Sequence, residues 1–251
     1  MPKFSEELES RLAPYRDEYR LIVNGWLAGG TFGVTYPALL VETFHYVKHS
    51  CSLMSRACAR LGHDVLPLQT YFAKHTAEEV GHEEWVLDDL EALGYDRREV
   101  EASRPLPETV SLIGSQLYII DYMHPAGLLG YVYLMESTPP NELSLAFLEA
   151  HGIGPDATTF LRRHGETDQR HGRELRQMLD LHFEEPRLRE AAVLSAVMGL
   201  SCVNRLLRRV KSGNYVNHFP ETTVPAAQTF QPVAPPLNPA LPQRPPAKAG
   251  Q

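Results

Sequence analysis

The sequence predicts an all-α protein, a bundle of about seven helices followed by a proline-rich tail. Three observations favour this class. Apolar residues recur at helical spacing over long segments, and glycines and prolines separate those segments. No stretch shows strong alternation of apolar and polar residues, which is typical of a half-buried strand. The hydrophobic fraction of 43% over 251 residues suits one domain with a sizeable core.

The predicted helices follow one another with short breaks. The first ends before Gly29 and Gly30, and Pro37 suits the first turn of the second helix, where its missing N–H costs nothing. Glycines also end the second and third helices, because glycine readily takes the conformation that closes a helix. The longest apolar helix is expected to kink near Pro125. The predicted spans are residues 6–24, 37–61, 66–93, 108–137, 142–151, 157–183 and 188–210.

The chain divides by composition into residues 1–213 and residues 214–251. The second part holds nine of the 20 prolines and few charges, so it cannot build a packed core. We predict a helical domain followed by a flexible tail. A passive tail is the simpler interpretation, and a polyproline ligand for a partner protein is the alternative.

Charge and cysteine content exclude several classes of protein. The formal net charge of −7, without a basic stripe, disfavours nucleic-acid binding. The three cysteines lack CxxC spacing, which indicates reduced thiols in a cytoplasmic protein. The charged N-terminus has no apolar signal core, and no uninterrupted apolar run reaches about 18 residues, so no membrane-spanning helix is expected.

Two stretches repeat one pattern, a histidine followed by an acid four residues on and a histidine three residues later. They are HTAEEVGH, with His75, Glu79 and His82, and HGETDQRH, with His164, Asp168 and His171. Steps of three, four and seven residues return to one face of a helix, so each stretch can direct two imidazoles and one carboxylate at one point. Each triad lies beside apolar residues, where unpartnered polar groups are costly. Together they predict a metal site.

Two further carboxylates are candidates to complete this site. Glu136 ends the apolar run GLLGYVYLME, and Glu42 lies in the mostly apolar segment LLVETFHYVKH, one turn before His45. Spacing alone leaves open whether Glu42 or His45 faces the site. With Glu79 and Asp168, these carboxylates would bring a charge of about −4, which two divalent ions balance. A shell of imidazoles and carboxylates without thiolate suits iron or manganese, and zinc less specifically.

The segments EEVGHEEWVLDDLEALG, GYVYLMES and FLRRHGETDQRH resemble those of the heme-oxygenase-like di-iron oxidases and oxygenases. The resemblance covers about residues 20–210 and implies a seven-helix heme-oxygenase-like fold. It implies the metal ligands Glu79, His82, Glu136, His164, Asp168 and His171. It also implies a carboxylate from the first core helix, for which Glu42 is the candidate and His45 the competitor. His75 departs from the family pattern. Its possible roles are a metal ligand, a group behind the ligands or a proton donor.

The resemblance further implies an oxidoreductase that holds two Fe(II) ions, or manganese in their place. It would use O2 as co-substrate on a small amino-acid-like, amine-like or fatty-acid-like metabolite, in a biosynthetic pathway. Aromatic and histidine side chains on the helix that leads to Glu136 are expected to line the substrate pocket, namely Tyr122, His124 and Tyr133. The expected partners are the small-molecule substrate, a second copy of the chain and an electron donor, with neither nucleic acid nor membrane.

Three alternatives remain open at this stage. A cofactor-independent enzyme of the same fold, thiaminase-like or similar to the pyrroloquinoline-quinone synthase, would use these polar groups to bind substrate. A heme binder would need one histidine in an otherwise apolar cleft, and the several carboxylates argue against it. A non-catalytic interaction protein would act through its proline-rich tail.

Overall fold

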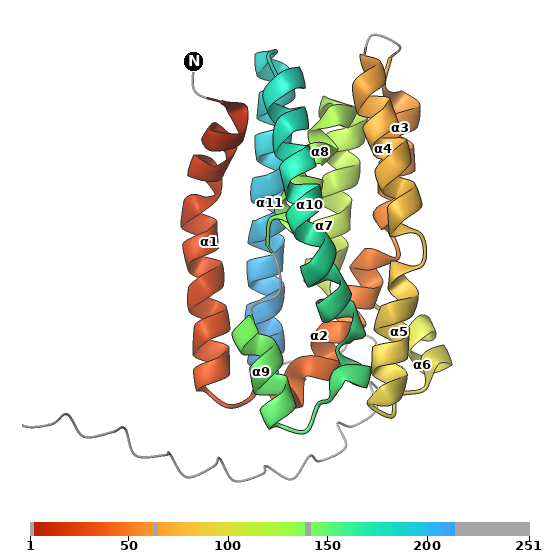
Figure 1. Ribbon diagram of the computed structural model, residues 1–251, viewed down its shortest axis with the longest axis vertical. Coiled ribbons are helices and arrows are strands. Elements are labelled where there is room, and N and C mark those ends of the chain that lie inside the picture. Colours follow the sequence, from red (N-terminus) through yellow and green to blue (C-terminus); the bar gives the residue numbers. More distant parts are fainter. Residues whose placement is uncertain (1–2, 63–64, 139–141, 214–251) are drawn as a thin grey trace, which may run out of the picture.

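The computed structural model describes residues 3–62, 65–138 and 142–213, without the side chains of residues 142 and 165–170. Within these ranges every regular element is helical, which confirms the all-α prediction. The predicted tail, residues 214–251, lies outside the described residues. Figure 1 shows long helices running roughly parallel and antiparallel along one axis. The helices are α1 (Phe4–Ala28), α2 (Phe32–Val47), α3 (Ser50–Arg60), α4 (Leu66–Glu79), α5 (His82–Ala92), α6 (Arg97–Ala102), α7 (Pro107–Tyr118), α8 (Leu128–Glu136), α9 (Glu142–Ala150), α10 (Thr159–His182) and α11 (Pro186–Lys211).

Three predicted helices are each divided in two. The second begins earlier than expected, at Phe32, with Pro37 inside it, and is interrupted between α2 and α3 at Lys48 and His49. The third is interrupted between α4 and α5, where Gly81 has φ +88°, a conformation that favours glycine. If α2–α3 and α4–α5 are each counted as one interrupted helix, the bundle has seven long members. The other five are α1, α7, α8, α10 and α11.

The break expected near Pro125 separates α7 from α8 completely. A five-residue π-helix, Ile119–Met123, follows α7, and His124 is extended. Pro125 then begins a short 3-10 turn, Pro125–Gly127, that leads into α8. The chain therefore reverses here, and α8 returns antiparallel to α7 with Glu136 as its last residue.

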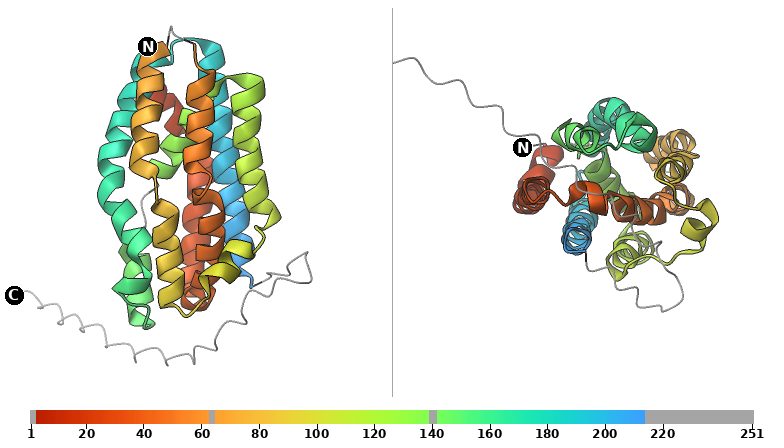
Figure 2. Two further views of the ribbon diagram at one scale, coloured as in Figure 1. Left: turned by 90° about the vertical axis from the view of Figure 1, so that its right-hand side faces the viewer. Right: turned by 90° about the horizontal axis from the view of Figure 1, so that it is seen from below.

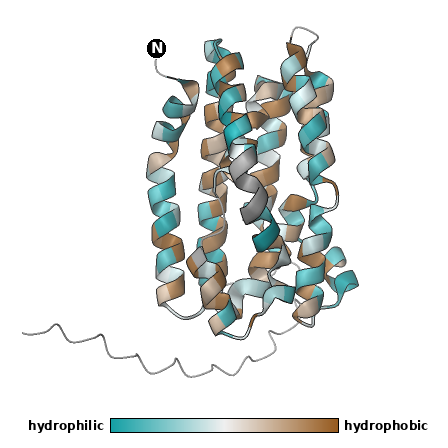
Figure 3. Ribbon diagram, in the orientation of Figure 1, coloured by the Kyte–Doolittle hydropathy of each residue, from teal (hydrophilic) through white to brown (hydrophobic). Residues whose placement is uncertain are grey.

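Helix α11 packs against α1, α7 and α8, and Figure 2 shows it (blue, right-hand view) at the side of the bundle between α1 and α7. At Gly130 of α8 the two backbones meet so closely that a Cβ would lie 1.9 Å from the carbonyl oxygen of Ala192. This contact requires glycine. The buried residues of α11, among them Leu188, Ala192 and Leu200, recur at helical spacing, and Figure 3 shows hydrophobic (brown) and hydrophilic (teal) residues alternating along the helices. By length and composition α11 could cross a membrane, but 56% of its most apolar window is buried in the bundle.

The buried side chains form two clusters, one in each half of the bundle. The first lies among the start of α1, α3, α4, α8 and the later turns of α10. The second lies among the end of α1, α2, α5 and the end of α11. In Figure 1 these are the upper and lower halves, and the breaks within α2–α3 and α4–α5 fall between them.

A buried carboxylate fixes the start of α10. Asp89 of α5 is 0% exposed, and its carboxylate accepts hydrogen bonds from the backbone N–H groups of Thr159 (2.7 Å) and Phe160 (2.9 Å). These N–H groups have no partner within their own helix, and a negative charge is favoured at a helix N-terminus. Asp89 therefore ties α5 to α10, which carry three of the candidate histidines.

Asp89→Ala should lower the free energy of unfolding by roughly 2–4 kcal/mol, because two buried N–H groups lose their acceptor. Urea denaturation measures the change. The matched control is Asp88→Ala, which removes a neighbouring carboxylate that is 60% exposed and forms an ion pair with Arg97 across 2.9 Å. It should change stability by less than about 0.5 kcal/mol. Equal effects of the two substitutions would contradict the capping function of Asp89.

Candidate metal centre

Six of the predicted ligands converge inside the bundle as two groups that share Glu79. The first group is His75, Glu79, Glu136 and His171, and the second is Glu79, His82 and His164. In each group one ligand atom per residue lies within 4.8 Å of all the others. All are buried except His164, which is partly buried.

Four helices supply these side chains. His75 and Glu79 are one turn apart on α4, and His82 is the first residue of α5. Between them the chain turns at Gly81 and directs Val80, 70% exposed, to solvent. The turn leaves the Glu79 carboxylate 3.1 Å from Nδ1 of His82. The other ligands are the last residue of α8, Glu136, and two residues of α10 that are seven apart, His164 and His171.

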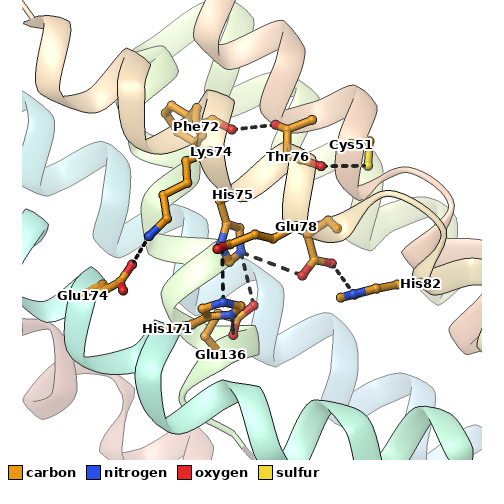
Figure 4. Close-up of polar contacts among 11 residues, drawn as sticks. Cys51, Phe72, Lys74, His75, Thr76, Glu78, His82, Glu136, His171 and Glu174 are labelled. Carbon is orange, nitrogen blue, oxygen red and sulfur yellow. Dashed lines mark hydrogen bonds and ion pairs between the residues drawn. The ribbon is translucent and has the colours of Figure 1, made fainter.

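In the first group, Glu136 lies between two imidazoles. Its Oε1 is 3.3 Å from Nε2 of His75 and its Oε2 is 3.0 Å from Nδ1 of His171. Figure 4 shows these three side chains pointing toward one another from α4, α8 and α10. Burial alone would raise the pKa of Glu136, but hydrogen bonds from His171 and His75 lower it to about 2. Glu136 is therefore a carboxylate at neutral pH, the form that binds metal ions.

Glu78 joins this group, although no spacing pattern predicted it as a member. Its Oε2 is 3.3 Å from Nε2 of His171 and 3.7 Å from Nδ1 of His75. Each of these nitrogens belongs to a ring whose other nitrogen faces Glu136. A carboxylate on the far side of a ligating imidazole orients the ring and increases its basicity. The only signal for it in the sequence is the doubled glutamate of HTAEEVGH.

In the second group, aromatic rings surround the histidines. His82 stacks on Trp85 with ring centroids 4.1 Å apart, and His164 lies 4.1 Å from Phe160. The His82 and His164 rings meet edge to face at 4.8 Å. Burial lowers the pKa of His164; the nearby Glu79 raises it by less, and His82 lowers it further. His164 is therefore neutral at physiological pH, as a metal ligand must be.

A cavity of about 130 Å³ lies against both groups. His75, Glu79, Glu136 and His164 form its polar wall. The rest is mainly apolar or aromatic, and the lining residues that are not candidate ligands are Tyr46, Val47, Ser50, Leu53, Met54, Leu128, Tyr131, Val132, Met135 and Phe160. The cavity can therefore bring a small molecule to the candidate ligands in largely apolar surroundings.

The three residues predicted to line the substrate pocket do not line this cavity. Tyr122 is 76% exposed and stacks on Tyr118. His124 accepts a hydrogen bond from the backbone N–H of Ala126 and caps the 3-10 turn. Tyr133 is buried on the side of α8 that faces α1, where its hydroxyl donates to Glu9. Tyr131, two residues earlier, lines the cavity instead.

Glu42 and His45 do not reach the two groups either. The Glu42 carboxylate accepts hydrogen bonds from Thr109 Oγ1 (2.6 Å) and the Leu106 N–H (3.1 Å) at the start of α7. His45 contacts Ser103 Oγ at 2.8 Å and Lys48 Nζ at 3.0 Å. Both side chains thus contact the segment that precedes and begins α7, and neither belongs to the two ligand groups. The expectation that one of them closes the metal site does not hold in this arrangement.

Asp168 lies on α10 between His164 and His171, and its side chain is outside what the structure describes. Its function as a ligand stays a prediction. Without Glu42, the carboxylates that surround the described centre are Glu78, Glu79 and Glu136.

The residues present fit a pair of first-row metal ions. The donor set is imidazole and carboxylate without thiolate, which suits iron or manganese. The Tyr71 ring stacks on His75 with centroids 5.5 Å apart, and its buried hydroxyl has no hydrogen-bond partner among the described groups. Buried hydroxyls are nearly always bonded, so a further polar species is expected beside this one.

Similar solved structures place the chain in one fold. A domain of unknown function with a heme oxygenase-like fold from Shewanella denitrificans has a TM-score of 0.70 and 24% identity, over 84% of this chain and 90% of that one. A TenA homolog from Pseudomonas syringae reaches a TM-score of 0.66 at 12% identity, over 84% and 93%. A CADD-like protein of unknown function from Nostoc punctiforme reaches 0.61 at 17%, over 84% and 96%. The fold is heme-oxygenase-like.

The chain belongs to a family described as iron-containing redox enzymes, whose model matches residues 38–203. This range holds every residue of the two ligand groups. A search of the curated proteins finds no match.

Glu42 should make stability depend on pH. Burial raises its pKa from 4.5 to about 7, against the lowering by the hydrogen bonds from Thr109 and Leu106. Between these values the folded chain binds a proton that the unfolded chain lacks, so stability is full below about pH 4.5 and falls as pH rises through 7. In the metal-free protein, Glu42→Gln should make the free energy of unfolding less dependent on pH between 4.5 and 7. The decrease that it removes is up to roughly 3 kcal/mol.

Urea denaturation at several pH values between 4.5 and 8 measures this effect. Glu99→Gln, at an exposed position in α6, is the matched control and should keep the wild-type slope. A Glu42→Gln variant with the same slope as the wild type would contradict the assignment.

Proposed function

We propose that this protein is a non-heme di-iron oxidase or oxygenase that activates O2 to oxidise a small metabolite. The observation that carries the proposal is the sharing of Glu79 by two buried ligand groups, because one carboxylate can bridge two metal ions. Membership of an iron-containing redox family supports iron as the metal. When bound, two ferrous ions supply the electrons with which O2 is reduced.

The protein's own residues would bind two metal ions, one on each side of Glu79. His75, Glu136 and His171 would hold one ion, and His82 and His164 the other. Asp168 would join them from α10. Glu78, behind His75 and His171, would keep these rings in place. The apolar wall of the cavity would exclude water from the reacting molecules.

A cofactor-independent enzyme of the same fold is the second candidate, and one observation disfavours it. Thiaminase-like chemistry needs a nucleophilic thiolate in the pocket, but no cysteine lines the described cavity. Cys51, which follows the lining residue Ser50 in sequence, donates a hydrogen bond to the carbonyl of Thr76. Burial and the carboxylates of Glu83 and Glu79 raise its thiol pKa, which disfavours the reactive form.

The first test of the proposal is the iron content of the full chain after anaerobic reconstitution with Fe(II). Wild type should bind two irons. His164→Ala and His171→Ala should each remove mainly one, since the two residues belong to different groups, whereas Glu79→Ala should reduce both. Elemental analysis of desalted protein gives the count, and an optical spectrum recorded on addition of O2 shows whether the bound iron reacts.

His182→Ala is the matched control, because His182 is on the same helix but outside both groups. It should bind iron as wild type does. The proposal fails if wild type holds well under one iron per chain, or if the three ligand substitutions leave the content unchanged. If metal-free protein turns over a substrate as fast as iron-loaded protein does, the cofactor-independent alternative is favoured.

A further inference from the structure

Helix α7 and the π-helix that follows it present an uncharged face to solvent. No Asp, Glu, Lys or Arg occurs between Glu108 and Asp121 in the sequence. Figure 2 shows α7 (yellow-green) on the outside of the bundle in both views. Surface helices normally turn charged and polar residues to solvent, and a contiguous exposed apolar face marks an interaction site. This tyrosine face consists of Val110, Gly114, Leu117, Tyr118 and Tyr122, which follow one another at steps of three or four residues.

The two tyrosines form an aromatic surface at one end of this face. Tyr118 is 56% exposed and Tyr122 is 76% exposed. Their rings stack with centroids 5.3 Å apart and planes 30° apart. Proline-rich segments bind to surfaces that are lined by aromatic side chains in this way. The tyrosine face therefore has the chemistry of a polyproline acceptor.

Gly114, in the middle of the face, leaves the helix backbone open to close approach. Glycine in a helix interior is less stable than alanine by about 1 kcal/mol. A Cβ at Gly114 would meet no described atom within 4 Å, so packing inside the described bundle does not require glycine here. An occupant that lies directly on the backbone of α7 accounts for it.

The tail contains a segment of matching chemistry, as its sequence shows. In PLNPALPQRP, residues 236–245, every third residue is proline, and Arg244 is the one charged residue. A polyproline II helix has three residues per turn, so in that conformation these prolines share one edge. Its backbone makes no internal hydrogen bonds, which leaves carbonyls that tyrosine hydroxyls can donate to. The repeat consists of Pro236, Pro239, Pro242 and Pro245.

The tail begins close enough to reach this face in the same chain. Helix α11 ends at Lys211, and near this end Nη1 of Arg209 lies 3.0 Å from Oε1 of Glu108, at the start of α7. From Glu108 to Tyr122 the distance along the helix is roughly 21 Å at 1.5 Å per residue. Residues 214–235 precede the repeat, and an extended chain covers about 3.3 Å per residue. Tethering gives an effective concentration on the order of 1 mM, so a weak contact is sufficient.

We propose that the proline repeat of residues 236–245 packs on the tyrosine face of its own chain. Both surfaces are nearly uncharged, and the tyrosine rings and the bare backbone at Gly114 fit a narrow polyproline II segment. The contact does not involve the candidate metal ligands. It is therefore independent of the proposed function.

Hydroxyl-radical footprinting of the full chain, read by mass spectrometry, tests the contact. The variant replaces all four prolines of the repeat, Pro236→Ser, Pro239→Ser, Pro242→Ser and Pro245→Ser, and leaves the bundle unchanged. If the contact alone has a Kd of about 0.5 mM, the face is covered roughly two thirds of the time, and modification of Tyr118 and Tyr122 should rise about threefold in the variant. Leu181, 68% exposed on α10, is the internal reference and should not change.

The matched control is Pro220→Ala with Pro225→Ala, which changes two prolines of the tail outside the repeat. It should keep the wild-type protection of both tyrosines. In the reciprocal experiment, Tyr118→Ala with Tyr122→Ala should increase modification of Leu237 and Leu241 in the tail. Leu66→Ala, at a position 62% exposed on α4, should not.

The inference is overturned if the two tyrosines are modified equally in wild type and in the four-proline variant. It is also overturned if their protection depends on protein concentration between about 1 and 100 µM, because a contact within one chain has a fixed effective concentration. Protection that depends on concentration but not on the prolines would assign the face to a second copy of the chain. Iron content should be the same in wild type and in all of these variants, whichever result is obtained.

Discussion

The shared carboxylate of Glu79 links the parts of this structure that matter for function. Four imidazoles and the carboxylates of Glu79 and Glu136 are gathered in the interior of the bundle. Taking such groups out of water is costly unless they are paired with one another or with a metal ion. Histidines pair with Glu136 and with Glu79, yet the arrangement remains rich in groups that prefer a cation between them. A metal centre is the simplest way to offset that cost.

The remainder of the fold holds these helices at the required places. Asp89 joins the start of α10 to α5, and Glu42 joins the start of α7 to α2. Gly130 lets α8 approach α11 closely, which places the end of α8, with Glu136, inside the bundle. The turn at Gly81 brings His82 back toward Glu79. Local backbone requirements and two buried carboxylates therefore determine the geometry of the centre.

The sequence predicted much of this centre because helical spacing is a local property. His75 with Glu79, and His164 with His171, could be placed on common faces by counting residues, and their convergence follows from burial of those faces. Glu42 could not be placed in this way. A carboxylate in an apolar segment needs a partner, but spacing does not distinguish a metal ion from the N-terminus of a helix 64 residues away in sequence. Spacing could not place Tyr122 and His124 either, because a π-helix and an extended His124 change the register of side chains before α8.

The most direct test of the central claim, that Glu79 joins two metal sites, is a crystal structure of the Fe(II)-loaded protein with anomalous diffraction at the iron edge. Two iron peaks on either side of the Glu79 carboxylate are predicted, one against His75, Glu136 and His171 and the other against His82 and His164. A fully loaded crystal without iron at these residues, or with a single ion that Glu79 does not contact, would contradict the account.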